Sequence, residues 1–178
     1  MSETGKAFIT RSRYHLREDF LPKIERCLEV LSDEQIWWRA NAQANSTGNL
    51  ILHLSGNVRQ WIVCGLGGGT DTRDRDAEFA QRESIPRAEL LSLLKGTLNE
   101  ADQTLAQIDP LRLLETRMIQ GLEVSALDAI LHVVEHFSMH TGQIILITKM
   151  LAESDLAFYE FIDSKPVLKW KSETANAE

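Results

Sequence analysis

Hydrophobic residues recur at three- and four-residue spacing along four long stretches of the chain, the period of an α-helix with one buried face. The first stretch runs from about Phe8 to Leu31, and Pro22 inside it is expected to kink or split that helix. The third runs from about Pro86 to Ile108, and the fourth, the most strongly patterned, from about Ala126 to Leu151. Four such helices joined by long crossover loops predict an all-α four-helix bundle.

The second helix is bounded by clear local signals. Ser46 or Thr47, near the end of the polar, loop-like segment 41–48, can cap its first turn. The glycine cluster at 65–69 is expected to end it, because glycine lacks the helical bias of other residues. A short helical turn that begins at Ser32 and carries two tryptophans is expected between the first and second helices.

The remaining connections are less regular. Residues Thr70–Glu83 are highly charged and are interpreted as an exposed loop. Residues Thr116–Val124 form two short arms around a glycine, which indicates a small hairpin or an extended excursion. The tail from Asp155 to Ile162 is expected to add a short helix, and residues after Lys171 are expected to fray. We interpret residues 1–178 as one domain, with a bundle core at about 8–152 and a C-terminal extension at 153–178.

Charge and cysteine content narrow the possible partners and location. The net charge of −7 and the absence of a basic stripe argue against nucleic-acid binding. No apolar run approaches the ~18 residues needed to span a membrane, and the first residues do not resemble a signal peptide. Cys27 and Cys64 lack C-x-x-C spacing, which is typical of reduced cysteines in a cytoplasmic protein.

The histidines carry the candidate chemistry. His132, His136 and His140 lie four residues apart on the fourth helix, and neighbours at this spacing can share one metal ion. All three cannot share an ion, because the outer two are roughly 12 Å apart along the helix axis. His140 lies within the apolar stripe and His136 borders it, whereas His132 is displaced toward solvent. The pair His136 and His140 is therefore favoured.

A third ligand must come from another helix. His53 is the best candidate, because Leu50 and Leu54 place it on the apolar face of the second helix, while His15 is a weaker one. Asn57 and Gln60 continue the side of His53 as a polar strip. The pattern alone leaves open whether these histidines bind metal or are hydrogen-bonded core residues. Because 178 residues can bury a sufficient core without a staple, any metal is expected to be functional.

Several segments resemble one known family. The fourth-helix sequence His136-Phe-Ser-Met-His140-Thr-Gly142-Gln143 is similar to the H-x-x-x-H-x-G-Q signature of the DinB/YfiT-like four-helix-bundle metalloproteins. The second-helix stretch from Asn49 to Leu54, which contains His53, is similar to the first-ligand motif of that family. The segments 31–39 and 73–79 also resemble it, so the similarity extends from about residue 8 to 152.

The resemblance implies that His53, His136 and His140 bind one divalent metal ion and that the protein is a homodimer. Zinc or nickel suits three imidazoles best, and manganese or iron is a further option. Gln143, Asn57 and Gln60 are candidates for hydrogen bonds around the ligands; for Gln143, a position facing solvent is weighed equally. His132 matches an extra histidine of such sequences and is left outside the ligand set.

Three functions remain open at this stage. Characterised relatives imply a metal-dependent enzyme acting on a small molecule, such as a thiol S-transferase that uses a low-molecular-weight thiol in detoxification or stress response. A non-enzymatic metal-binding or structural dimeric bundle is the second option, and a metal-dependent hydrolase or isomerase is the third. No nucleophile or acid–base carboxylate pair stands out in the sequence, so the catalytic residues are unknown and enzymatic activity itself is an open question.

Overall fold

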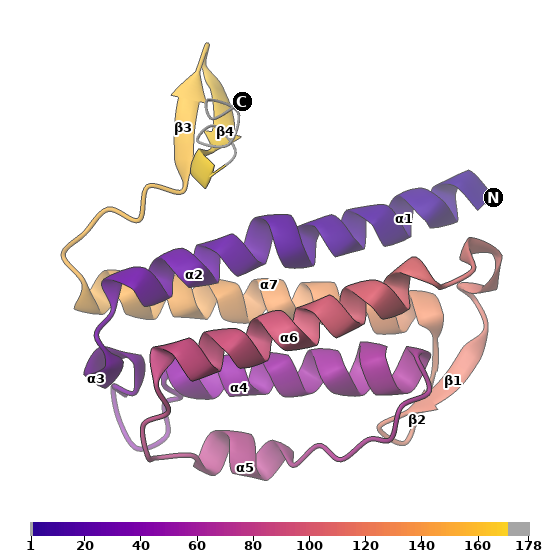
Figure 1. Ribbon diagram of the computed structural model, residues 1–178, viewed down its shortest axis with the longest axis horizontal. Coiled ribbons are helices and arrows are strands. Elements are labelled where there is room, and N and C mark those ends of the chain that lie inside the picture. Colours follow the sequence, from indigo (N-terminus) through magenta and orange to yellow (C-terminus); the bar gives the residue numbers. More distant parts are fainter. Residues whose placement is uncertain (1, 171–178) are drawn as a thin grey trace.

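The computed structural model describes residues 2–170, and within them four long helical rods pack side by side as a bundle (Figure 1). The first rod is α1 (Ser2–Tyr14), η1 (His15–Phe20) and α2 (Leu21–Val30); the second is α4 (Thr47–Val58) and η2 (Arg59–Leu66); the third is α6 (Arg87–Ala106); the fourth is α7 (Ala126–Leu151). The second rod contacts both the third and the fourth, and α2 contacts α7. The predicted all-α four-helix bundle is confirmed.

The core of the bundle is aliphatic and is drawn from all four rods. Its fully buried side chains include Ile24, Leu28, Ile51, Leu54, Leu94, Leu98, Val133 and Phe137. These residues occupy the three- and four-residue spacing that identified the helices, so burial of one face explains the pattern. No helix among the described residues has the length and apolarity required to cross a membrane.

Pro22 changes the type of helix instead of breaking the first rod. A π-helical turn, η1, directly precedes it, and the Leu21 N–H bonds the Leu16 carbonyl five residues back. Proline has no N–H to offer the carbonyl four residues earlier, that of Glu18. The Glu18 carbonyl instead accepts a hydrogen bond of 3.2 Å from Trp170 Nε1. The expected kink or split is thus replaced by one turn of wider helix.

The connections contain short elements of their own. They are α3 (Asp33–Ile36), α5 (Arg75–Ala80), η3 (Pro110–Arg112) and the antiparallel hairpin of β1 (Thr116–Ile119) and β2 (Leu122–Ser125). The hairpin confirms the prediction for this segment. Its two turn residues, Gln120 and Gly121, have φ values of 54° and 77°, as a two-residue turn between right-twisted strands requires. Ser125 then caps α7 by accepting a hydrogen bond from the Asp128 N–H.

The expected helix at 155–162 is wrong. The segment forms β3 (Tyr159–Ile162), which pairs antiparallel with β4 (Lys165–Leu168). This hairpin projects outward beyond the first rod (Figure 1), and the Lys23 ammonium lies 5.5 Å from the centre of the Tyr159 ring. Asp163 and Ser164 have φ values of 50° and 63° and make its two-residue turn. The tyrosine, phenylalanine and isoleucine of β3 favour a strand over a helix. The expected fraying after Lys171 concerns residues outside the described part of the chain.

The interpretation of 70–83 as an exposed loop is also wrong in part. The segment contains the helix α5, which lies along α4 (Figure 1). Asp74 caps this helix by accepting a hydrogen bond from the Ala77 N–H. The side chains of Arg73 and Glu78 are only 5% and 11% exposed. Opposite charges that pair with each other can be buried at a cost far below that of a lone charge, which explains how a charged segment covers α4.

Candidate metal centre

Three histidine rings from two rods meet inside the bundle. His53 lies on α4, and His136 and His140 lie one turn apart on the facing side of α7; one ligand atom from each ring falls within 4.8 Å of the others. His53 Nε2 and His136 Nε2 are 2.8 Å apart. His53 and His140 are 4% and 8% exposed, and His136 is half-buried. The structure therefore brings together the three histidines that the sequence singled out.

His140 presents a free lone pair to this cluster. Its Nδ1 donates a hydrogen bond of 2.7 Å to Gln143 Oε1, so its other nitrogen, Nε2, carries no proton in the neutral ring. His140 Nε2 is buried and has no hydrogen-bond partner. A buried acceptor without a partner is costly in a folded protein, and a ligand that accepts its lone pair removes that cost.

The cluster favours neutral rings. Burial lowers the pKa of His136, and the neighbouring His140, His53 and His132 act in the same direction; together they bring this pKa to about 3. Burial also lowers the pKa of His140, against the opposing effect of the hydrogen bond to Gln143. A metal ligand must be an unprotonated imidazole, so the environment holds these side chains in the form that can bind metal.

The α5 segment completes the surroundings of His53. Glu78 Oε2 lies 2.9 Å from His53 Nδ1, and Arg73 Nη2 lies 3.0 Å from the same nitrogen. Arg73 also donates to both carboxylate oxygens of Glu78, at 2.7 and 2.9 Å. Burial raises the pKa of Glu78, but the hydrogen bonds from Arg73 and His53 outweigh it, so the pKa of this carboxyl lies below its ordinary value.

Sequence reasoning did not identify Arg73 and Glu78 as part of the site. Their segment is rich in alternating charges and has no apolar period, so nothing in it indicates which side chain turns inward. One local signal was available: Asp74 precedes a short stretch that it can cap, which places Glu78 on the first turns of a helix.

The other candidate residues lie around the three histidines at different distances. Gln143 contacts His140 directly. Asn57 Nδ2 lies 3.3 Å from His132 Nε2, and the His132 ring packs on Trp61 with 4.1 Å between centroids. His132 is outside the cluster of three, as the sequence indicated.

Gln60 contacts Arg73 rather than a histidine. Its Oε1 accepts a hydrogen bond of 2.9 Å from Arg73 Nη1, and its Nε2 donates one of 2.7 Å to Asp71. His15, the weaker candidate, pairs with Asp19 on the first rod at 3.2 Å and is not part of the cluster.

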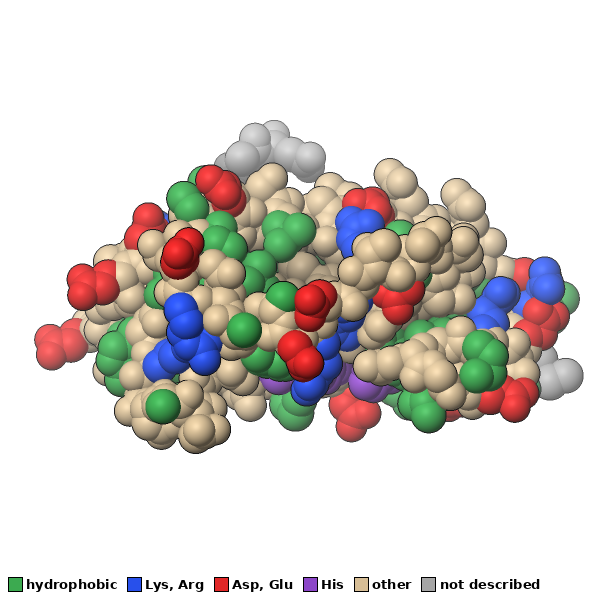
Figure 2. Space-filling view, turned by 90° about the horizontal axis from the view of Figure 1, so that it is seen from below, with side chains coloured by type: hydrophobic (Ala, Val, Ile, Leu, Met, Phe, Trp, Pro, Cys, Tyr) green, Lys and Arg blue, Asp and Glu red, His purple; other side chains and the backbone are tan. Residues whose placement is uncertain are grey.

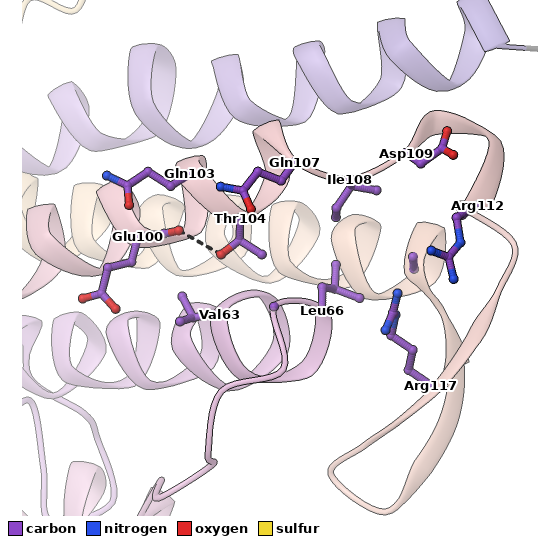
Figure 3. Close-up of a pocket in the computed structure, with 12 residues that line it drawn as sticks. Val63, Leu66, Glu100, Gln103, Thr104, Gln107, Ile108, Asp109, Arg112 and Arg117 are labelled. Carbon is purple, nitrogen blue, oxygen red and sulfur yellow. Dashed lines mark hydrogen bonds between the residues drawn. The ribbon is translucent and has the colours of Figure 1, made fainter.

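Of two cavities beside η2 and the α5 segment, one lies away from the histidine cluster and the other adjoins it through Arg73 and Glu78. Histidine side chains are visible at the surface beside basic side chains in the view from the α5 side (Figure 2). A cavity of about 480 Å³ lies instead between η2, the end of α6 and β1, with Glu100 and Gln103 at one end and Arg112 and Arg117 at the other (Figure 3). A second, of about 380 Å³, lies between α4, α6 and the α5 segment, and Arg73 and Glu78 form part of its wall.

Comparison with known proteins identifies the fold and the family. A crystal structure of a DinB-like protein from Bacillus cereus ATCC 10987 superimposes with a TM-score of 0.55 and 15% sequence identity, over 75% of this chain and 91% of that one. This similarity shows that the two share a fold, as the resemblance of the histidine motifs implied. No curated protein matches the chain. The profile of the DUF1572 family, described as a protein of unknown function, matches residues 3–161. The chain therefore belongs to the DUF1572 family and has a DinB-like fold.

Proposed function

We propose that His53, His136 and His140 bind one divalent metal ion through their Nε2 atoms and that the protein is a metal-dependent enzyme. The observation that carries the proposal is the buried, unpartnered Nε2 of His140 beside two further imidazole nitrogens. Nitrogens bound tetrahedrally at ~2.0–2.1 Å are roughly 3.3 Å apart, which lies between the 2.8 Å and the 4.8 Å seen here. Small rotations of the rings suffice to reach that spacing.

The donor set supports a catalytic rather than a closed structural site. Three neutral imidazoles leave the charge of a divalent ion uncompensated and leave at least one coordination position for a small molecule. An ion held in this way can acidify a bound water or bind a thiolate. The nitrogens of these rings that face away from the cluster have neighbours of their own: Gln143 contacts His140 Nδ1, and Glu78 and Arg73 lie beside His53 Nδ1. Zinc and nickel are the ions that suit this set best.

The metal is tested first, because every activity proposed depends on it. The metal-free protein is titrated with Zn²⁺ and with Ni²⁺ by calorimetry, and the protein purified without added metal is analysed for bound elements. We expect one ion per chain, and a loss of binding in His53→Ala and in His140→Ala. His132→Ala is the matched control, since it removes a neighbouring histidine outside the cluster. Binding that survives His140→Ala would contradict the assignment.

For the reaction, we propose the transfer of a low-molecular-weight thiol to an electrophilic small molecule. An ion held by three imidazoles would have a coordination position to spare, and the half-buried His136 lies nearer the surface than the other two rings. This supports the choice, since a soft thiolate is a strong ligand for zinc and nickel. Loss of thiol is measured with glutathione or cysteine and 1-chloro-2,4-dinitrobenzene, in the metal-loaded protein and in His140→Ala. Equal rates in the two would exclude the transferase. If ester or amide substrates are cleaved instead, the hydrolase is correct; a metal-loaded protein inactive on all of them favours a non-enzymatic metal-binding bundle.

A further inference from the structure

We propose that Glu78 is a positioning residue of the metal site: its carboxylate fixes the tautomer and the orientation of His53, and Arg73 fixes the carboxylate. This inference rests on the proposed metal site and extends it to the α5 segment. The geometry points to it because the two nitrogens of His53 have separate neighbours. Nε2 faces His136, and Nδ1 faces Glu78 and Arg73.

The neighbours of Nδ1 compete for opposite tautomers. A carboxylate oxygen only accepts hydrogen bonds, so Glu78 Oε2 at 2.9 Å requires the proton of the neutral ring to be on Nδ1. A guanidinium only donates, so Arg73 Nη2 at 3.0 Å would favour an unprotonated Nδ1 and a proton on Nε2. Only the first tautomer leaves Nε2 free to bind a metal ion. Glu78 therefore selects the binding form, and Arg73 alone would select the blocked form.

Arg73 is kept from the blocking role by the same carboxylate. It donates to Glu78 Oε1 and Oε2 at 2.7 and 2.9 Å, while its Nη1 is engaged by Gln60 at 2.9 Å. A two-pronged pair of this kind has a defined plane and is among the strongest polar contacts in proteins. The side chains of Arg73 and Glu78 are only 5% and 11% exposed, and hydrogen bonds are stronger in such a buried environment. Burial therefore strengthens the hold of this pair on the orientation of His53.

The backbone of the α5 segment is itself anchored to α4, close to His53. Asn49, four residues before His53, donates hydrogen bonds of 2.8 and 3.2 Å to the carbonyls of Glu78 and Gln81. The Phe79 ring packs against His53, with 4.5 Å between centroids. Gly56 leaves the space in which the carboxylate lies, since a Cβ at that position would overlap Glu78 Oε1. The α4 helix thus fixes the position of the Glu78 carboxylate beside His53 and leaves the space that it occupies.

The first test is metal affinity, measured by competition of Zn²⁺ and Co²⁺ with a chromophoric chelator. We expect Glu78→Ala to weaken binding by ~10–100-fold, the usual effect of removing a carboxylate that orients a metal-bound histidine. Glu78→Gln keeps an accepting oxygen and should lose less. Gly56→Ala displaces the carboxylate without removing it and should behave like Glu78→Ala. Asp76→Ala, which removes an exposed acid of the same helix, is the matched control and should bind as the wild type does.

A rescue separates this role from mere support of the fold. In Glu78→Ala the guanidinium of Arg73 is left to donate to His53 Nδ1, so the additional change Arg73→Met should recover part of the lost affinity. If Arg73 and Glu78 only stabilise the packing of α5, the metal affinities of the single and double variants would follow their free energies of unfolding, because removing both charges of a buried pair also restores stability. That result, or an unchanged affinity in Glu78→Ala and Gly56→Ala, would overturn the proposal.

The tautomer is also observable without metal. Nitrogen-15 NMR of the histidine rings in the metal-free protein should place the His53 proton on Nδ1 in the wild type and on Nε2 in Glu78→Ala. A wild type that binds no Zn²⁺ or Co²⁺ would refute the proposed function, while the NMR experiment would still decide whether Glu78 selects the tautomer. If the His53 proton is on the same nitrogen in the wild type and in Glu78→Ala, the positioning role of Glu78 is refuted, while the proposed metal site is not.

Discussion

The individual histidines determine what this bundle can do. His140 combines an occupied Nδ1 with a buried, free Nε2, and His136 is surrounded by three further imidazoles. These environments disfavour the protonated forms of His136 and His140, so unprotonated ring nitrogens lie close together. The same feature has a cost for the metal-free protein, because its stability depends on the rings remaining neutral.

The metal-free protein should lose stability as the pH falls from 7 to 5. The pKa of His136 is about 3 in the folded chain, below the ordinary value of about 6.5 expected in the unfolded chain. Below about pH 6.5 the His136 imidazole therefore binds a proton in the unfolded state but not in the folded state, and unfolding becomes more favourable. Urea unfolding at pH 7, 6 and 5 measures this, and His136→Asn should show a weaker dependence on pH. Identical pH dependence in the two proteins would contradict the shift.

Two glycines in helices should respond to the same substitution in opposite directions. A Cβ at Gly48 would lie 2.7 Å from the Trp37 ring, whose Nε1 is held by the Ile85 carbonyl, so Gly48→Ala should destabilise the protein by about 1–3 kcal/mol. Gly96 has nothing within 4 Å of that position, so Gly96→Ala should stabilise it by about 0.5–1 kcal/mol. The melting temperatures of both variants are compared with that of the wild type. A higher melting temperature in Gly48→Ala would show that the Trp37 ring can move away from the added Cβ.

At the scale of elements, α4 is the one on which the site is assembled. It carries His53, contacts α7, and holds the α5 segment that supplies Arg73 and Glu78. Its first turn is closed by a reciprocal pair in which Ser46 accepts from the Asn49 N–H and the Asn49 side chain accepts from the Ser46 N–H. The Asn49 side chain therefore serves both the start of α4 and the attachment of α5.

Asn49→Ala should affect α5 more than the rest of the bundle. The change removes the buried hydrogen bonds to Ser46 and to the carbonyls of Glu78 and Gln81, and a loss of about 1–3 kcal/mol in the free energy of unfolding is expected. Amide hydrogen exchange should rise most in 75–81. Ser125→Ala, which removes the cap of α7 and touches neither α4 nor α5, is the comparison and should leave exchange in α5 unchanged. Equal exchange of α5 in the two variants would show that Asn49 is not its main anchor.

For the molecule as a whole, the homodimer stays a prediction, and one surface supports it. The outer side of α7 exposes Leu131, Met139, Leu146 and Met150, each by 49–64%. An exposed row of large apolar side chains on one helix is typical of a protein interface. We expect the wild type to sediment as a dimer and the variant Leu146→Glu/Met150→Glu as a monomer. Leu111→Glu is the control, because it places the same charge on an exposed residue of η3, outside this row of α7 side chains. A monomeric wild type would refute the prediction.

Much of this architecture follows from local rules that the sequence states directly. The period of apolar residues identified the four rods, and the range expected for the fourth, Ala126 to Leu151, is that of α7. The hairpin at 116–125 follows from a glycine between two short arms. The spacing of His136 and His140 placed both on one side of α7, because helix geometry alone decides which residues of a helix are neighbours.

Other features depended on contacts between segments far apart in the chain. The Glu18 carbonyl left free by Pro22 receives its partner from Trp170, and the short strands of the C-terminal extension have too few residues for a clear period. Arg73 and Glu78 turn inward only because His53 and Asn49 on α4 and Gln60 on η2 offer partners. The sequence by itself determined the helices and the inward-facing histidines, since helical phase is a local property. Only the tertiary structure decided which charges are buried beside them, because the cost of burying a charge depends on the groups that surround it.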